Sequence, residues 1–108
     1  MEQTGERYIP GQSGIIAIEH LNRYYFVIHQ IRLKHKVVVD LASGEGYGSE
    51  LLANYAEKVY GIDISIEAID HARQKYRKSN LEFLVGDALK IPLEDKIADI
   101  FVSFETIE

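Results

Sequence analysis

The feature that most constrains the fold is a series of three apolar segments that each close with an aspartate. They are residues 36–41 with Asp40, residues 58–63 with Asp63, and residues 81–85 with Asp87 just beyond. Three consecutive valines at 37–39 indicate a strand that is buried on both faces, as in a parallel sheet. Because parallel strands end at the same edge of a sheet, we expect the three carboxylates to lie along that edge.

Helical patterns separate the expected strands. Apolar residues recur at helical spacing over 14–33, 49–55 and 66–78, and a fourth strand is predicted at 97–103. Strands that alternate with helices imply parallel pairing with right-handed crossovers. The sequence therefore predicts an α/β fold, a three-layer parallel sheet preceded by an N-terminal helix.

Composition sets the domain count and excludes several classes of protein. With 108 residues, 46% of them hydrophobic, the chain has enough side chains for one small core. A net charge of −5 without a basic tract argues against general nucleic-acid binding. The absence of cysteine excludes thiolate metal sites and fits a reducing cytoplasm. Residues 1–6 lack the pattern of a signal peptide, and the apolar runs are too short to span a membrane. We expect a cytoplasmic protein without a metal site, since His29, His35 and His71 lack ligand spacing.

A glycine-rich turn after the first strand indicates the type of ligand. Gly44, Gly46 and Gly48 allow a sharp turn and a close approach of the backbone to a ligand. Their spacing departs from the dinucleotide pattern, and the lysine of a phosphate-binding loop does not follow them. Asp40 and Glu45 place negative charge at the turn, which repels a pyrophosphate and attracts an ammonium or sulfonium group.

The second acid, Asp63, indicates which group lies next to the cationic part of the ligand. Asp63 follows Gly44 by 19 residues, the distance at which an acid accepts hydrogen bonds from ribose hydroxyls. An adenosine-like ligand with a cationic tail is therefore expected, and S-adenosylmethionine fits. A nicotinamide dehydrogenase is a distant alternative, against the glycine spacing and Asp40.

Four segments resemble motifs I to IV of the class I S-adenosylmethionine-dependent methyltransferases, which are Rossmann-like proteins. The segments are residues 38–46, 60–65, 86–88 and 99–105, in the family's order. The family has a seven-stranded sheet, of which this chain contains the first four strands, in the order 3-2-1-4. Residues 4–10 and 19–24 are similar to a microbial subgroup linked to sugar or cell-surface polysaccharide biosynthesis.

The resemblance divides the chain and assigns the methionine end of the cofactor. Residues 1–35 are expected to form an N-terminal arm and helix, and residues 36–108 the cofactor-binding half-domain. The methionine part is expected at Asp40 and the turn, with Asp40 near its amino group. The expected turn residues are Ala42, Ser43, Gly44 and Gly46. Ala42 departs from the family, which has glycine at that position.

The same resemblance assigns the nucleoside end. Asp63 is expected to bind both ribose hydroxyls and Ile64 to lie against the adenine ring. Asp87 is expected to accept from the adenine amine, and the backbone N–H of Ala88 to face a ring nitrogen. Ser103 and the residues up to 105 are expected near the reactive methyl group.

Catalysis by such a protein is mainly alignment of donor and acceptor. The candidates for a general base are Glu105 and His20, although the favoured interpretations are a helix N-terminal acid for Glu105 and a polar position on the first helix for His20. Arg23 or Tyr8 is a candidate to cover the cofactor. Tyr24, Tyr25 and Phe26 are expected to be core residues.

The resemblance stops at residue 108, before the family's last three strands. A strand at 97–103 then becomes an apolar edge, and we expect two copies to pair through it as a homodimer. Two function classes stay open: a methyltransferase with a small-molecule or sugar-type acceptor that needs a completing half, and a non-catalytic module that binds S-adenosylmethionine or has lost that function.

Overall fold

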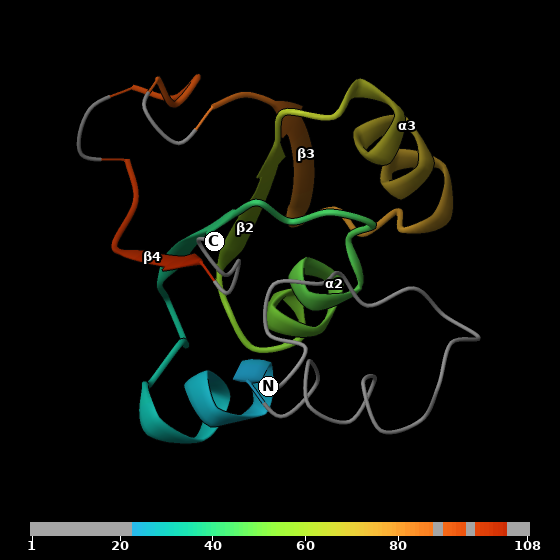
Figure 1. Cartoon of the computed structure of the whole chain (residues 1–108). Coiled ribbons are helices and arrows are strands. Elements are labelled where there is room, and N and C mark those ends of the chain that lie inside the picture. Colours follow the sequence, from blue (N-terminus) through green and yellow to red (C-terminus); the bar gives the residue numbers. More distant parts are fainter. Residues whose placement is uncertain (1–22, 88–89, 95–96, 104–108) are drawn as a thin grey trace, which may run out of the picture.

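Four parallel strands form the centre of the molecule (Figure 1). The computed structural model describes residues 23–87, 90–94 and 97–103. The strands are β1 (Val37–Leu41), β2 (Lys58–Asp63), β3 (Leu81–Val85) and β4 (Ile100–Ser103). The helices are α2 (Tyr47–Ala53), α3 (Ile66–Lys75) and an N-terminal helix over 23–30.

The sheet has the order β3-β2-β1-β4, which confirms the prediction. Asp40 of β1 lies opposite Gly61 of β2 and Val102 of β4. Asp63 pairs with Val85, so β1 and β2 end at the same edge of the sheet as β3. The strand order therefore places the glycine turn next to the ends of the neighbouring strands, which is where α/β proteins bind ligands.

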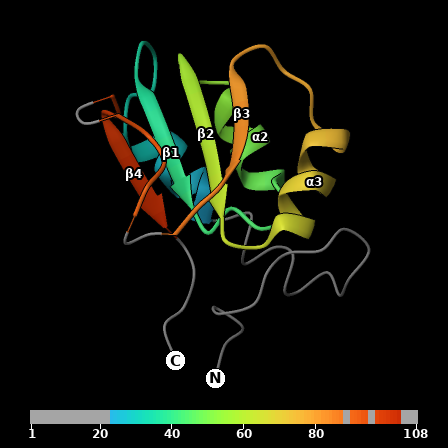
Figure 2. The ribbon, with the colours of Figure 1, turned by 90° about the horizontal axis from the view of Figure 1, so that it is seen from above.

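The helices pack on one face of the sheet (Figure 2). Val38, Val59 and Leu81 face them at one register across three strands. The helices contribute Tyr24 and Val27 from helix 23–30, Leu52 and Ala53 from α2, and Ile69 and Ala72 from α3. Residues on both sides of position 35 thus share one hydrophobic core.

The segment between β3 and β4 lies on the other face of the sheet. Its Pro92 lies against Gly86, next to Ile62 of β2. Val39 and Ile62 point away from the helices, yet both are fully buried. In the described part of the chain this segment, rather than a second layer of helices, covers the centre of that face.

Several element boundaries differ from the predicted ones. Helix 23–30 ends three residues before the predicted end at 33, and α2 begins at Tyr47 instead of residue 49. The last turn predicted for α3 is missing because Tyr76 is extended, with φ −120° and ψ 116°. β4 begins at residue 100, because Asp99 caps β1: its N–H donates to the Val37 carbonyl and its carboxylate accepts from the Val37 N–H.

The predicted core side of the first helix is confirmed only in part. Helical spacing predicts a stripe that includes Tyr25, Ile28 and Ile31; Ile28 packs against the core, whereas Tyr25 and Ile31 are exposed, and so is Phe26. The buried residues of this helix are Tyr24 and Val27. Residues 24–28 are all apolar or aromatic, so helical spacing fits two adjacent stripes and cannot choose between them. Tyr55 and Ile66, which are among the apolar residues at helical spacing in 49–55 and 66–78, are also exposed.

The described helices are short. None of those in the described ranges is both long and apolar enough to cross a membrane.

Candidate functional site

The glycine turn is held against β2 by backbone hydrogen bonds. The Ser43 N–H donates to the Ile62 carbonyl over 2.9 Å, and the Gly46 N–H donates to the Ser43 carbonyl over 3.1 Å. The Gly44 N–H donates to the Asp63 carboxylate over 2.8 Å. These bonds bring the turn and the end of β2 together, as the sequence predicts.

Three residues of the turn adopt left-handed backbone conformations. Ala42 and Gly44 both have φ 59°, and Gly46 has φ 94°. A Cβ at Gly46 would lie 2.8 Å from the Ala72 Cβ and 2.9 Å from Cζ of Phe83, so only glycine fits there. Ala42 does carry a Cβ in this conformation, which costs an L-residue about 1–2 kcal/mol.

Asp63 shapes the turn and leaves acceptor sites at its edge. Its Oδ2 accepts from the Gly44 N–H, and its Oδ1 accepts from the Ser65 N–H over 2.9 Å. The residue is only 5% exposed. A carboxylate has about four lone-pair positions, so each oxygen keeps one for a ligand.

Asp40 is enclosed by hydrogen-bond donors from two helices. The Ser49 hydroxyl of α2 donates to its Oδ2 over 2.7 Å. The Tyr24 hydroxyl lies 3.2 and 3.3 Å from the two carboxylate oxygens. Asp40 has no exposed surface. The sequence placed Asp40 at the turn, but it did not reveal that Tyr24 and Ser49 bind its carboxylate.

Burial shifts the acid–base properties of this pair. It raises the pKa of the Asp40 carboxyl from 3.8 to about 7, and the negative charge of Asp63 adds to the rise. The hydrogen bonds from Ser49 and Tyr24 oppose it because they favour the ionised form. Burial, followed by the nearby Asp40, also raises the pKa of the Tyr24 hydroxyl well above its usual value. Tyr24 therefore stays a proton donor at every pH at which proteins are normally studied.

The other predicted cofactor residues lie around the same edge. Ile64, next to Asp63, is 71% exposed. Asp87 is exposed two residues beyond β3, and Ser103 is exposed at the end of β4, opposite Leu41. The Ser43 hydroxyl is buried, and no hydrogen-bond partner for it occurs among the described residues. Ala88, His20, Glu105 and Tyr8 lie outside the described residues.

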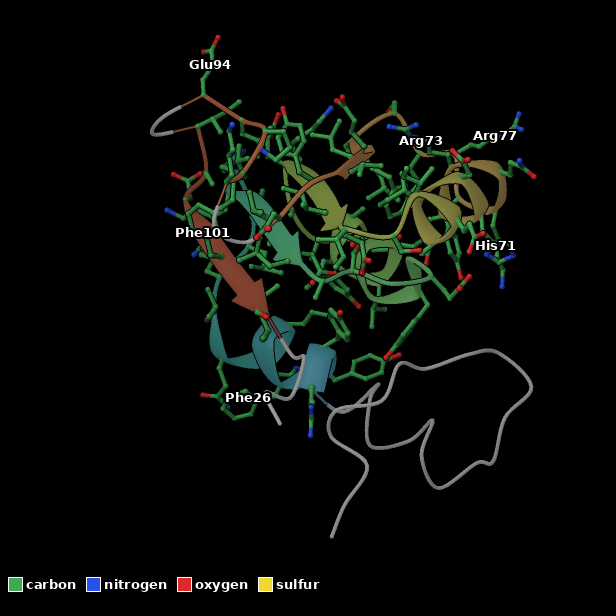
Figure 3. The ribbon with its side chains drawn as sticks, turned by 45° about the horizontal axis from the view of Figure 1, so that its top comes forward. Phe26, His71, Arg73, Arg77, Glu94 and Phe101 are labelled. Carbon is green, nitrogen blue, oxygen red and sulfur yellow. The ribbon has the colours of Figure 1, made fainter. Side chains whose placement is uncertain are left out.

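A contact between Glu45 and His71 was missed. Oε1 of Glu45 in the turn pairs with Nδ1 of His71 on α3. His71 is half exposed, in agreement with its interpretation as a surface residue (Figure 3). The two residues are 26 positions apart, and no local pattern signals their contact. The Glu45 carboxylate of the turn therefore forms an ion pair with His71 when the imidazole is protonated.

The arrangement has the chemistry of a nucleoside site with a cation-attracting end. The described ranges contain no cluster of three or more histidine, aspartate or glutamate residues that would hold a metal ion. The available groups are carboxylate acceptors at the strand ends, backbone groups of the turn and the apolar Ile64 side chain.

Comparison with known families decides the wider assignment. A family model described as a methyltransferase domain matches residues 39–108, which include the turn and all four strands except the first residues of β1. The chain belongs to this methyltransferase family. The family predicted from motifs I to IV is thus confirmed.

Individual relatives agree with the family. A Mycolicibacterium smegmatis protein named "Probable S-adenosylmethionine-dependent methyltransferase" is 35% identical over 97% of this chain and 40% of its own length. A solved protein from Pyrococcus horikoshii has a TM-score of 0.66 and 38% identity, over 86% of this chain and 46% of its own. A chain of the complex that contains the Haloferax volcanii Trm112 methyltransferase activator has a TM-score of 0.70 and 28% identity, over 80% and 39%. The chain thus spans about two fifths of the length of the curated relatives it matches.

The strained turn predicts that Ala42→Gly stabilises the folded chain. Glycine removes the cost of a Cβ in the left-handed region but loses more chain entropy on folding, so we expect a gain of about 1 kcal/mol in the free energy of unfolding. Urea denaturation measures it. Ala53→Gly, within α2, is the control and should be destabilising. A loss of stability in Ala42→Gly would contradict the strain at this position.

Burial of Asp40 predicts a pH-dependent stability cost. Because its pKa is higher in the folded than in the unfolded chain, the folded state binds the proton more tightly, and stability falls as the pH rises from 4 to 7. Relative to Asp40→Asn, the wild type should lose up to about 1.4 kcal/mol of unfolding free energy per pH unit in that range. Denaturation at several pH values measures the difference, and the exposed Asp70→Asn is the control. Parallel pH profiles of wild type and Asp40→Asn would show that the pKa is not raised.

Proposed function

We propose that this chain binds S-adenosylmethionine at the shared edge of β1, β2 and β3 and forms the donor-binding half of a methyltransferase. The observation that carries the proposal is the environment of Asp63. This buried carboxylate is fixed by the N–H groups of Gly44 and Ser65 and keeps one acceptor position on each oxygen. Two adjacent ribose hydroxyls match those two positions.

The neighbouring groups fit the rest of the nucleoside. Exposed Ile64 offers an apolar surface for the adenine ring, directly after the ribose-binding acid. The exposed carboxylate of Asp87 follows the next strand and is proposed to accept from the adenine amine. The backbone N–H of Ala88 is proposed to face a ring nitrogen.

The turn fits the amino-acid end of the cofactor. Backbone groups of Ala42, Gly44 and Gly46 are proposed to border the methionine part, since the left-handed turn directly follows the end of β1. A buried hydroxyl without a partner in the described structure is available at Ser43. Asp40 is proposed to attract the ammonium group through its charge, since its oxygens are already engaged by Tyr24 and Ser49.

S-Adenosylmethionine supplies an activated methyl group on a sulfonium sulfur when it is bound. The residues of this chain bind and orient that group, and Ser103 is proposed to border it at the end of β4. We propose a small molecule or a sugar as the acceptor, on the support of the N-terminal similarity to a microbial subgroup. Glu105 and His20 are the proposed bases, needed only if the acceptor must lose a proton.

We propose the cytoplasm as the location, supported by a sequence without cysteine. The second candidate function is a non-catalytic module that binds S-adenosylmethionine. The observation that favours it is that the environment of Asp63 accounts for cofactor binding, which this module shares with an enzyme. Turnover with a completing partner separates this module from an enzyme.

Isothermal titration with S-adenosylhomocysteine tests the site. Asp63→Asn keeps the size of the side chain but replaces one acceptor oxygen by an NH2 donor, which faces the N–H of Gly44 or Ser65. The variant therefore loses a charge-assisted hydrogen bond to the ligand and weakens one of the bonds that hold the turn. We expect the Kd to rise by about tenfold or more, equivalent to the loss of one such bond.

The matched control is Asp70→Asn, which removes an exposed carboxylate on α3 and changes the net charge by the same amount as Asp63→Asn. Its Kd should equal that of the wild type. Failure of the folded wild type to bind would contradict the proposed function, and equal binding by Asp63→Asn would remove Asp63 from the site.

We also propose that two copies associate through β4. Within the described residues β4 is an edge strand, and Phe101 on it is 54% exposed (Figure 3). Phe26, on the outer side of helix 23–30, is 64% exposed (Figure 3). An apolar edge strand associates readily with another chain, and a second copy provides the same strand by two-fold symmetry.

Light scattering at high concentration tests the dimer. We expect a dimer for the wild type and a monomer for Phe101→Lys, because a charge at the edge opposes strand pairing. Val85→Lys, at an exposed apolar position of the opposite edge strand, should stay dimeric. A wild type that is monomeric at high concentration would exclude the association.

A further inference from the structure

Tyr24 connects the N-terminal helix to the turn from a distance of 16 residues. Its hydroxyl lies 3.2 Å from Oδ2 and 3.3 Å from Oδ1 of Asp40. Both residues are buried, and the shared carboxylate also accepts from Ser49 on α2. One acid thus joins helix 23–30, β1 and α2.

The ring of Tyr24 makes a second connection. It lies so close to Gly48, in the first turn of α2, that a Cβ on that glycine would overlap the ring. The Tyr47 ring meets it edge to face, with the centroids 5.6 Å apart. The third glycine of the turn region is therefore explained by contact with Tyr24 rather than with a ligand.

We propose that Tyr24 is a positioning residue of the cofactor site, whose hydroxyl orients the Asp40 carboxylate and favours its ionised form, and whose ring fixes the start of α2. This inference rests on the proposed binding of S-adenosylmethionine. Helix 23–30 then belongs to the binding site, although Arg23 is its only described residue that the sequence analysis offers as a candidate for contact with the ligand. The site would be incomplete in a chain that begins at β1.

The electrostatics give the proposal a measurable signature. The titratable or charged groups that act on this pair include Asp63 of β2, which acts on Asp40, and Arg23 and Tyr47, which act on Tyr24. Asp40 has a pKa of about 7, which the Tyr24 hydroxyl keeps from rising further. The attraction for an ammonium group should therefore grow as the pH passes through 7. Without the hydroxyl this change should occur at higher pH.

Two measurements test the proposal: the titration of the Asp40 side-chain carboxyl carbon by NMR in the ligand-free protein, and the Kd for S-adenosylhomocysteine between pH 5.5 and about 9, on the full chain. The variants are Tyr24→Phe, which removes only the hydroxyl, and Ser49→Ala, which removes the other donor and leaves the ring contact. Tyr25→Phe is the matched control, since this neighbouring tyrosine is exposed.

In Tyr24→Phe we expect the Asp40 midpoint to rise by about one pH unit, which corresponds to about a tenfold change in protonation. The Kd should then be up to about tenfold weaker at pH 7 and approach the wild-type value near pH 9. Ser49→Ala should shift the Asp40 midpoint and the Kd in the same directions as Tyr24→Phe. It therefore tests the proposal if Tyr24→Phe does not fold. Tyr25→Phe should follow the wild type.

Two results would overturn the inference. One is an unchanged Asp40 midpoint in folded Tyr24→Phe, or, if that variant does not fold, in Ser49→Ala. The other is a Kd that Tyr24→Phe weakens equally at every pH, as a purely structural defect would. A third result separates this inference from the proposed function: the wild type binds no S-adenosylhomocysteine, while the Asp40 midpoint shifts as expected. The proposed function, and with it the role of Tyr24 in cofactor binding, would then be wrong. The hydrogen bond from Tyr24 to Asp40 would still be confirmed.

Discussion

The hydrogen bond from the Gly44 N–H to the Asp63 carboxylate joins the two parts on which the site depends. It links the turn after β1 to the end of β2, over 2.8 Å and between residues 19 apart. The second carboxylate oxygen accepts from Ser65, the residue that caps α3. One buried side chain therefore sets the positions of the turn, the strand end and the following helix. A ligand that bonds to this acid meets a surface that is already organised, which lowers the ordering cost of binding.

A second acid close to the same edge makes the arrangement costly for stability. Asp40 and Asp63 are both buried, and the charge of Asp63 contributes to the raised pKa of Asp40. Two carboxylates in a small core oppose each other and lose hydration, which apolar residues of similar size would avoid. A cationic ligand end would relieve this repulsion. Under the proposed function, the arrangement exchanges stability of the free chain for affinity, as binding sites commonly do.

The backbone plan of this molecule could be predicted from local patterns. The valine run, the acids at the strand ends and the glycine turn are short-range signals, and β2 and β3 have the predicted bounds. The buried face of helix 23–30 could not be predicted, because residues 24–28 offer two apolar stripes of nearly equal quality. The side to be buried is selected by Tyr24, whose hydroxyl reaches Asp40 on another element. Contacts of this kind, including Glu45 with His71, depend on tertiary geometry that no sequence period encodes.

Two glycines that look alike in the sequence are required for different structural reasons. Gly46 has a positive φ and would place a Cβ against Ala72 and Phe83, so it is required by the turn itself. Gly48 is helical, and its missing side chain makes room for the Tyr24 ring. Ala42 shows the converse, a residue with a Cβ in a left-handed conformation that glycine adopts at no steric cost. The positions of the glycines are therefore determined both by the backbone conformation of the turn and by the packing of the N-terminal helix. It follows that the turn and helix 23–30 form one structural unit, in which Tyr24 is the part that the motif alone does not contain.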